Sequence, residues 1–190
     1  MSVSLLVSFG VVAVLLVYGI STYNRLVTLK HGVDKAWANI DVLLKQRHDE
    51  LPKLVETCKQ YAQFEQKTLQ QVIEARSKVQ AARQTQDMAA LGAAEGMLRS
   101  GLGQIFAVAE AYPELRANES FMQLQSRISQ LENAIADRRE FYNEAVNINN
   151  VRVEQFPDSV IAGLFRFGAK PLLQFSAGEK KDVDLKKLFA

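Results

Sequence analysis

The sequence predicts an all-α protein in which an N-terminal transmembrane helix precedes an antiparallel, up-and-down helical bundle. Three observations predict this class: residues 3–20 form an uncharged apolar run, later apolar residues recur at steps of three and four, and only four prolines interrupt the 190 residues. Long amphipathic helices of similar length with short connections are typical of such bundles. We expect three parts: an anchor at 1–22, a bundle domain at 23–157, and a short apolar segment with a C-terminal tail at 158–190.

The first part is expected to be a single-pass membrane anchor, with the lipid bilayer as its partner. No residue from Val3 to Ile20 is charged, and the first charged side chain is Arg25. A helix of about 20 residues rises about 30 Å, which matches the hydrocarbon core of a bilayer. The alternative is a cleaved signal peptide. Neither a basic region before the run nor a small-x-small motif after it is present, so we favour a retained helix.

The charges that flank this run predict its orientation. No Lys or Arg precedes the run, whereas Arg25, Lys30 and Lys35 follow it. By the positive-inside rule, the N-terminus lies outside and the long C-terminal part lies in the cytoplasm. The inverse orientation is the alternative, because long domains can be exported regardless of their flanking charges.

The bundle domain begins with an apolar seam that continues through Pro52. A proline within a helical pattern either kinks the helix or marks a turn between two helices. A turn at Pro52 gives a four-helix bundle, whereas a kink gives three helices with a long first one. The similar segment lengths favour the turn and the in-phase seam favours the kink. We prefer the turn, and hence four helices.

The later helices have recognisable starts. Asp87 is a predicted N-cap for a segment that ends near Ala111 and contains four glycines, which close approach of a neighbouring helix would explain. Asn118 is the predicted cap of 119–154, the segment with the clearest heptad spacing. The residues predicted to pack in the bundle are Trp37, Ile40, Leu44, Leu124, Ile128, Leu131, Ile135 and Tyr142.

The third part carries a short apolar stretch beside two cations, Arg166 and Lys170. If the last long helix returns to the membrane, this stretch lies near the bilayer surface and can form an interfacial element. The alternative is that its side chains close one end of the bundle core. The residues concerned are Ile161, Leu164, Phe165 and Phe167. The run 176–190 is expected to be a solvated tail.

The composition and motifs predict no enzyme and no cofactor. The net charge is +2 with 23% charged residues, so nothing indicates a nucleic-acid partner. Cys58 is the only cysteine, His31 and His48 are far apart in the sequence, and no metal, nucleophile or phosphate-binding motif occurs. We therefore expect no catalytic, cofactor or metal residues.

Six polar residues are candidates for a seam between helices or for a subunit interface. Buried polar groups in bundles usually form hydrogen bonds that fix helix register. A metal-dependent enzyme that uses Glu110 and Glu132 is a remote alternative, since the Glu-x-x-His motifs of di-iron bundles are missing. The candidates are Glu110, Tyr112, Glu132, Asn133, Arg139 and Asn143.

Several stretches together resemble the LemA family of bacterial membrane proteins. They are YNRLV at 23–27, VDKAWANIDV at 33–42, AEAYPELRANESFMQLQ at 109–125, LENAIADRREFYNEAVN at 131–147 and FPDSVIAGLF at 156–165. The resemblance implies one anchor with the N-terminus outside, a helical bundle in the cytoplasm, a place in the bacterial inner membrane, and no established enzymatic activity. Family members associated with bacterial organelle membranes suggest membrane organisation.

Our first functional hypothesis is therefore a non-enzymatic, membrane-anchored scaffold that forms homo-oligomers through its helices. The second is an adaptor that docks onto a membrane protein partner, such as a membrane protease. Both rest on the anchor and on the long apolar seams, which suit binding to other helices.

Overall fold

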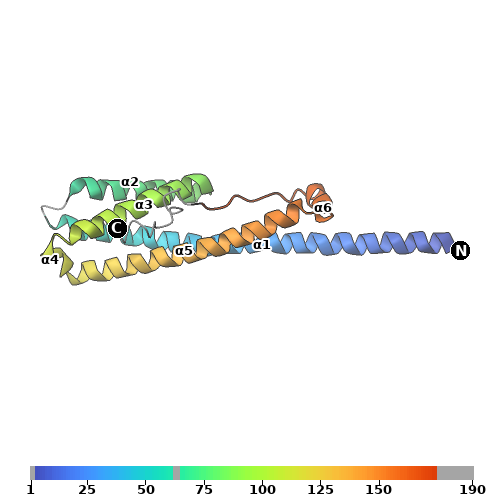
Figure 1. Cartoon of the computed structure of the whole chain (residues 1–190), viewed down its shortest axis with the longest axis horizontal. Coiled ribbons are helices and arrows are strands. Elements are labelled where there is room, and N and C mark those ends of the chain that lie inside the picture. The colour runs from blue at the N-terminus through green and yellow to red at the C-terminus, as the bar shows by residue number, and fades with distance from the viewer. Residues whose placement is uncertain (1–2, 62–64, 175–190) are drawn as a thin grey trace, which may run out of the picture. The chain divides into compact units, whose positions relative to one another are not determined.

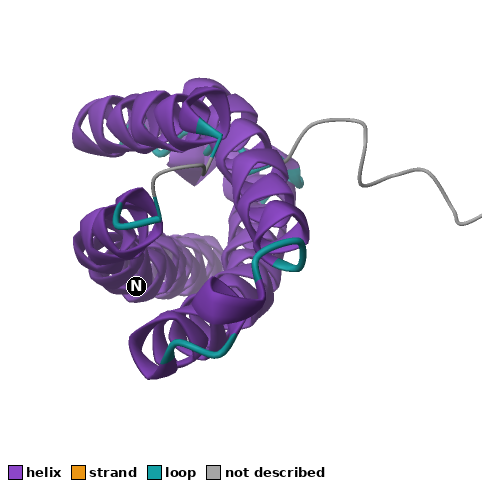
Figure 2. Ribbon diagram, turned by 90° about the vertical axis from the view of Figure 1, so that its left-hand side faces the viewer, coloured by secondary structure: helices purple, strands orange, loops and turns teal. Residues whose placement is uncertain are grey.

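The computed structural model describes residues 3–61 and 65–174, and every regular element in that part of the chain is a helix (Figures 1 and 2). The predicted all-α class with a long apolar first helix is confirmed. The elements are α1 (Val3–Lys59), α2 (Gln66–Thr85), α3 (Met88–Ala109), α4 (Pro113–Arg116), α5 (Glu119–Glu154) and α6 (Asp158–Leu164).

Helix α1 is one helix of 57 residues with Pro52 inside it. The turn that we preferred at Pro52 is therefore wrong. The long-first-helix alternative is also only partly right, because α1 ends at Lys59 and α2 starts at Gln66. The part of the chain that the structure describes still contains four long helices, α1, α2, α3 and α5, with the first break just after Lys59 instead of at Pro52.

A contact from α2 explains how α1 continues through the proline. Proline has no N–H, so the carbonyl four residues earlier, that of His48, loses its helical donor. In the structure Arg76 Nε–H donates to the His48 carbonyl oxygen at 3.0 Å. The carbonyl that Pro52 leaves without a helical bond therefore has a partner, and the helix can pass through this position.

The N-termini of α3 and α5 are capped by the residues that the sequence predicts. Asp87 is the N-cap of α3, and its Oδ1 accepts hydrogen bonds from the N–H groups of Ala89 and Ala90 at 3.1 and 2.9 Å. At the start of α5, Asn118 Oδ1 accepts from the N–H of Phe121 at 3.0 Å. Both predicted caps are confirmed. Between α2 and α3, Gln86 takes a left-handed conformation (φ 53°) that allows a tight turn.

The chain divides into two compact units. Unit 1 comprises Met1–Asn39 and Glu140–Leu172, and unit 2 comprises Ile40–Arg139 and Leu173–Ala190. Within unit 2, segments of α1, α2, α3 and α5 form a bundle whose buried apolar residues recur at helical spacing. This core includes Ile40, Leu44, Leu51, Leu54, Val72, Val79, Leu91, Leu98, Ile105, Phe121, Ile128 and Ile135.

Unit 1 joins the first part of α1 to the last part of α5 and to α6. Its buried residues include Leu26, Val33, Tyr142, Val146 and Ala162. The Trp37 and Tyr142 rings meet edge to face with their centroids 6.1 Å apart. The predicted solvated tail, 176–190, lies outside the described residues.

Candidate functional site

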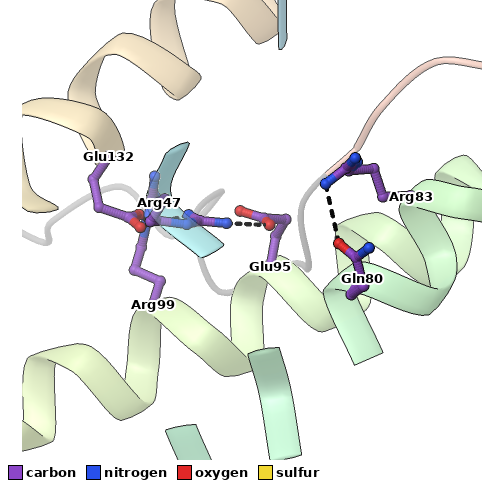
Figure 3. Close-up of polar contacts among 6 residues, drawn as sticks. All are labelled: Arg47, Gln80, Arg83, Glu95, Arg99 and Glu132. Carbon is purple, nitrogen blue, oxygen red and sulfur yellow. Dashed lines mark hydrogen bonds and ion pairs between the residues drawn. The ribbon is translucent and has the colours of Figure 1, made fainter. Parts of the chain in front are cut away.

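A network of buried charges joins three helices of unit 2. α1 places Arg47, α3 places Glu95 and α5 places Glu132 around one point, with the Arg47 guanidinium between the two carboxylates (Figure 3). Arg47 Nη1 donates to Glu132 Oε1 at 2.5 Å, and Nη2 donates to Glu95 Oε1. The Arg47 and Glu95 side chains are only 1% and 4% exposed.

Arg47 keeps its positive charge in spite of its burial. Burial alone would lower the pKa of Arg47, but the negative charges and hydrogen bonds of Glu95 and Glu132 outweigh it and raise that pKa. Burial raises the pKa of Glu95, against the opposing pull of Arg47. Arg99 adds a second cation 3.5 Å from Glu132. This arrangement fixes which faces of α1, α3 and α5 meet, because a shift of one helix would leave a buried charge unpaired.

Further ion pairs join α1 to α2 and α1 to α5 within unit 2. Arg83 of α2 lies 2.7 Å from Asp41 of α1. Arg83 also donates a hydrogen bond to Gln80 at 3.0 Å (Figure 3). Arg127 of α5 lies 3.0 Å from Glu50 of α1.

The described residues contain no group of three or more His, Cys, Asp or Glu that could hold a metal ion. Burial also raises the pKa of the Cys58 thiol to about 12, so this group is protonated at neutral pH.

His48 forms a second polar contact between α1 and α2. Its Nε2 lies 2.6 Å from Nη2 of Arg76, so the neutral ring accepts a hydrogen bond there. Nδ1 of the same ring is buried and makes no hydrogen bond within the described part of the chain. Burial, followed by the positive charge of Arg76, lowers the pKa of His48.

We expect His48 to make the bundle less stable in acid. Because its pKa is lowered on folding, the unfolded chain binds more protons below about pH 6.5, and the contribution of His48 to stability is present above that pH and lost as pH falls. Urea unfolding of the detergent-solubilised chain at pH 7.5 and 5.5 measures the loss. His48→Gln keeps an acceptor for Arg76 and cannot titrate, so the loss should be smaller in this variant; equal losses would contradict the prediction.

Unit 1 contains a buried carboxylate that attaches α6 to α1. Asp158, in the first turn of α6, accepts a hydrogen bond from Tyr18 at 2.7 Å and a longer one from Thr22 at 3.5 Å. Its other oxygen lies 2.6 Å from Arg152 Nε of α5. Asp158 thus links α6 to an interior part of α1 and to the end of α5 through one side chain that is nearly inaccessible to solvent.

The asparagines near the end of α5 hold the segment that follows α6. Asn150 accepts from the backbone N–H of Lys170 at 2.8 Å and donates to the Lys170 carbonyl at 2.9 Å. Asn149 donates to the Gly168 carbonyl at 3.4 Å, and the Tyr142 hydroxyl donates to the Pro171 carbonyl at 3.0 Å. These polar residues serve a contact within the chain.

The structure places the predicted residues in different environments. Of the eight packing residues, Ile40, Leu44, Ile128, Leu131, Ile135 and Tyr142 are buried, and Trp37 and Leu124 are half-buried. Among the polar candidates, Glu132 lies in the Arg47 network, whereas Glu110 and Asn133 are exposed and Tyr112, Arg139 and Asn143 are half-buried. Of the four membrane-surface candidates, Leu164 and Phe165 are exposed, and Ile161 and Phe167 are half-buried.

Two comparisons with known proteins found matches to the chain. The model of the LemA family matches residues 36–186. Two similar proteins, the magnetosome proteins MamQ 1 and MamQ 2 of Paramagnetospirillum magneticum, are each 23% identical to the chain over 168 residues. Each match covers 76% of this chain and 62% of the relative, so the chain spans less than two thirds of their length. Since the family model covers most of the sequence, the chain belongs to the LemA family.

Proposed function

We propose that the chain is a membrane-anchored scaffold that self-associates through helix faces and thereby organises membrane or partner proteins. The anchor is the apolar start of α1, which is long and apolar enough to cross a bilayer. Its large apolar side chains from Val3 to Ile20 are exposed, whereas the same helix carries buried residues from Thr22 onward. An exposed run of this composition is suited to lipid.

The flanking charges support one orientation for this anchor. Arg25, Lys30 and Lys35 follow the span, and the positive-inside rule then places the rest of the chain in the cytoplasm of a bacterium, with the anchor in its inner membrane. The magnetosome proteins that resemble the chain come from a bacterium, which supports the same setting.

An exposed apolar stripe on α5 carries the proposal of self-association. Phe141, Ile148 and Val151 lie on one face of the helix and are 62%, 45% and 53% exposed. Their spacing of seven and three residues is that of a helix–helix seam. Apolar side chains that gather on one helix face of a folded protein commonly mark a contact with another protein. A second copy would bring an identical stripe, as a two-fold symmetric dimer requires.

We expect Ile148→Lys to shift the full-length chain from oligomer toward monomer, because it places a charge in the centre of the stripe. Blue-native electrophoresis and mass photometry in detergent and in lipid nanodiscs measure the assembly. The matched control is Gln70→Lys, which adds the same charge to an exposed position on a different helix, α2.

A photo-crosslinker at residue 148 in native membranes identifies the partner directly. A crosslink between two copies of this chain supports self-association. A monomeric wild type, or equal dissociation by both variants, would contradict the proposal. A crosslink to a different membrane protein in place of a second copy would favour the adaptor.

A further inference from the structure

Unit 1 contains two adjoining hollows beside the end of the apolar run of α1. The first is an apolar groove of about 390 Å³ whose lining includes Leu15, Leu16, Gly19 and Ile161. The second is a polar cavity of about 490 Å³ whose lining includes Lys30, Arg166 and Lys170. Tyr23 and Phe165 line both hollows, so the groove and the cavity adjoin at these two side chains.

The cavity has a strong excess of positive charge. Lys30 and Arg166 are exposed, Lys170 is half-buried, and no Asp or Glu is among the lining residues. The side chains of these three cations form no ion pair within the described parts of the chain. Because three cations around one hollow repel one another, an anion bound among them would lower their electrostatic energy.

The backbone at Arg166 supports a role for its side chain. Arg166 ends α6 in the left-handed region (φ 58°), where the N–H of Phe167 donates to the Ala162 carbonyl at 2.9 Å. Glycine is the residue favoured at this position of a helix end, because an L side chain is strained there. An arginine in a strained conformation at the edge of a basic cavity indicates a use for its charge.

The segment that carries Arg166 and Lys170 is held in place before any ligand binds. The Tyr23 ring contacts Phe165 and Phe167 with centroid distances of 4.7 and 5.7 Å. The backbone of Lys170 forms two hydrogen bonds with the Asn150 side chain, one donated and one accepted by Asn150. A preorganised site loses less conformational freedom on binding, which favours a defined ligand over a diffuse charge effect.

We propose that these hollows bind one anionic phospholipid, with its phosphate at Lys30, Arg166 and Lys170 and an acyl chain in the groove along Leu16 and Gly19. This inference rests on the proposed membrane anchor, since only an anchored chain presents the groove to lipid. The apolar groove is what selects a lipid phosphate over free phosphate, because a free ion would leave the groove empty. Basic pockets next to membrane spans suit anionic headgroups.

Native mass spectrometry of the full-length chain, released from detergent with equimolar phosphatidylglycerol and phosphatidylcholine, tests the proposal. We expect selective retention of phosphatidylglycerol. Replacing Lys30, Arg166 and Lys170 by Gln should weaken that binding by about 100-fold, at about fivefold for each cation. The matched control replaces Lys45, Lys59 and Lys67, which are exposed and lie in unit 2, and should leave the selectivity unchanged.

Arg166→Gly separates binding from folding. Glycine relieves the left-handed backbone, so the melting temperature should stay equal or rise, while phosphatidylglycerol binding falls about fivefold. Binding that survives this change and the triple substitution would overturn the proposal, as would full displacement of the lipid by inorganic phosphate. Retention of the chain in carbonate-washed membranes with equal binding of both lipids would overturn the lipid site alone. Release of the chain by carbonate would overturn the anchor itself.

Discussion

Replacing Arg47 by Met should lower the free energy of unfolding of the bundle by about 3–5 kcal/mol at neutral pH. Arg47 is buried and is the direct hydrogen-bond partner of Glu95, so its loss leaves the Glu95 carboxylate in a site that water does not reach. The Glu132 carboxylate is destabilised less, because the positive charge of Arg99 remains 3.5 Å from it. Urea denaturation of the detergent-solubilised chain, followed by circular dichroism, measures the change.

The pH dependence of this variant identifies the cause. Burial already raises the pKa of Glu95, and the loss of the Arg47 charge raises it further. A carboxyl group whose pKa is raised on folding gives its full contribution at low pH and loses it as pH rises through the folded pKa. The deficit of Arg47→Met should therefore be smallest in acid and largest near neutrality. A deficit that is independent of pH would indicate lost packing instead of an unpaired carboxylate.

Two further variants complete the test. Lys78→Met removes the same kind of charge from an exposed ion pair with Glu74 and should change stability little. Replacing Arg47, Glu95 and Glu132 together by apolar residues of similar size should recover most of the loss, because well-packed apolar groups often replace a buried ion network at no cost. Recovered stability in the triple variant would show that the network contributes more to the register of the helices than to the stability of the bundle.

The network could have been predicted from the sequence, because in each of two apolar seams a charged residue stands at a position where the spacing calls for an apolar one. The first seam runs from Ile40 to Leu44 and then to Leu51, and Arg47 occupies the missing position. In the third segment the stripe passes from Leu91 to Leu98, and Glu95 fills the same kind of gap. A charge in the middle of a buried stripe must have a partner, and two opposite charges in two such gaps suggest each other.

Other features depend on contacts that no local pattern records. Pro52 is compatible with α1 because Arg76, from the next helix, hydrogen-bonds the carbonyl that the proline leaves without a donor. Asp158 has the sequence context of an ordinary acidic residue in a first helical turn, yet its partner Tyr18 lies 140 positions away. The apolar first helix, the all-helical class and the caps at Asp87 and Asn118 follow from periodicity and local chemistry, so they could be predicted.

Two glycines of α3 should respond to alanine in opposite directions. A Cβ at Gly101 would lie 2.9 Å from Cγ2 of the buried Val72 of α2, which is closer than side chains tolerate. A Cβ at Gly103 would meet nothing within 4 Å. The close approach that we predicted for the glycines of this segment therefore exists at Gly101 and not at Gly103.

The gain in helix propensity and the cost of steric overlap can be estimated separately at these two glycines. Alanine improves helix propensity by about 1 kcal/mol at either position, so Gly103→Ala should stabilise the chain by about 0.5–1 kcal/mol. At Gly101 the clash is with a β-branched side chain that has one favoured rotamer in a helix, and overpacking of this kind costs about 1–3 kcal/mol. Gly101→Ala should therefore destabilise the chain by as much as about 2 kcal/mol.

A double-mutant cycle with Val72→Ala tests the mechanism. Val72→Ala removes the methyl group that the new Cβ would meet, so Gly101→Ala should cost less in that background than in the wild type. Urea unfolding of the four proteins gives the coupling energy, and Gly103→Ala in both backgrounds is the control that should show none. If Gly101→Ala and Gly103→Ala stabilised the chain equally, α2 and α3 would not approach each other at Gly101 as closely as the structure shows.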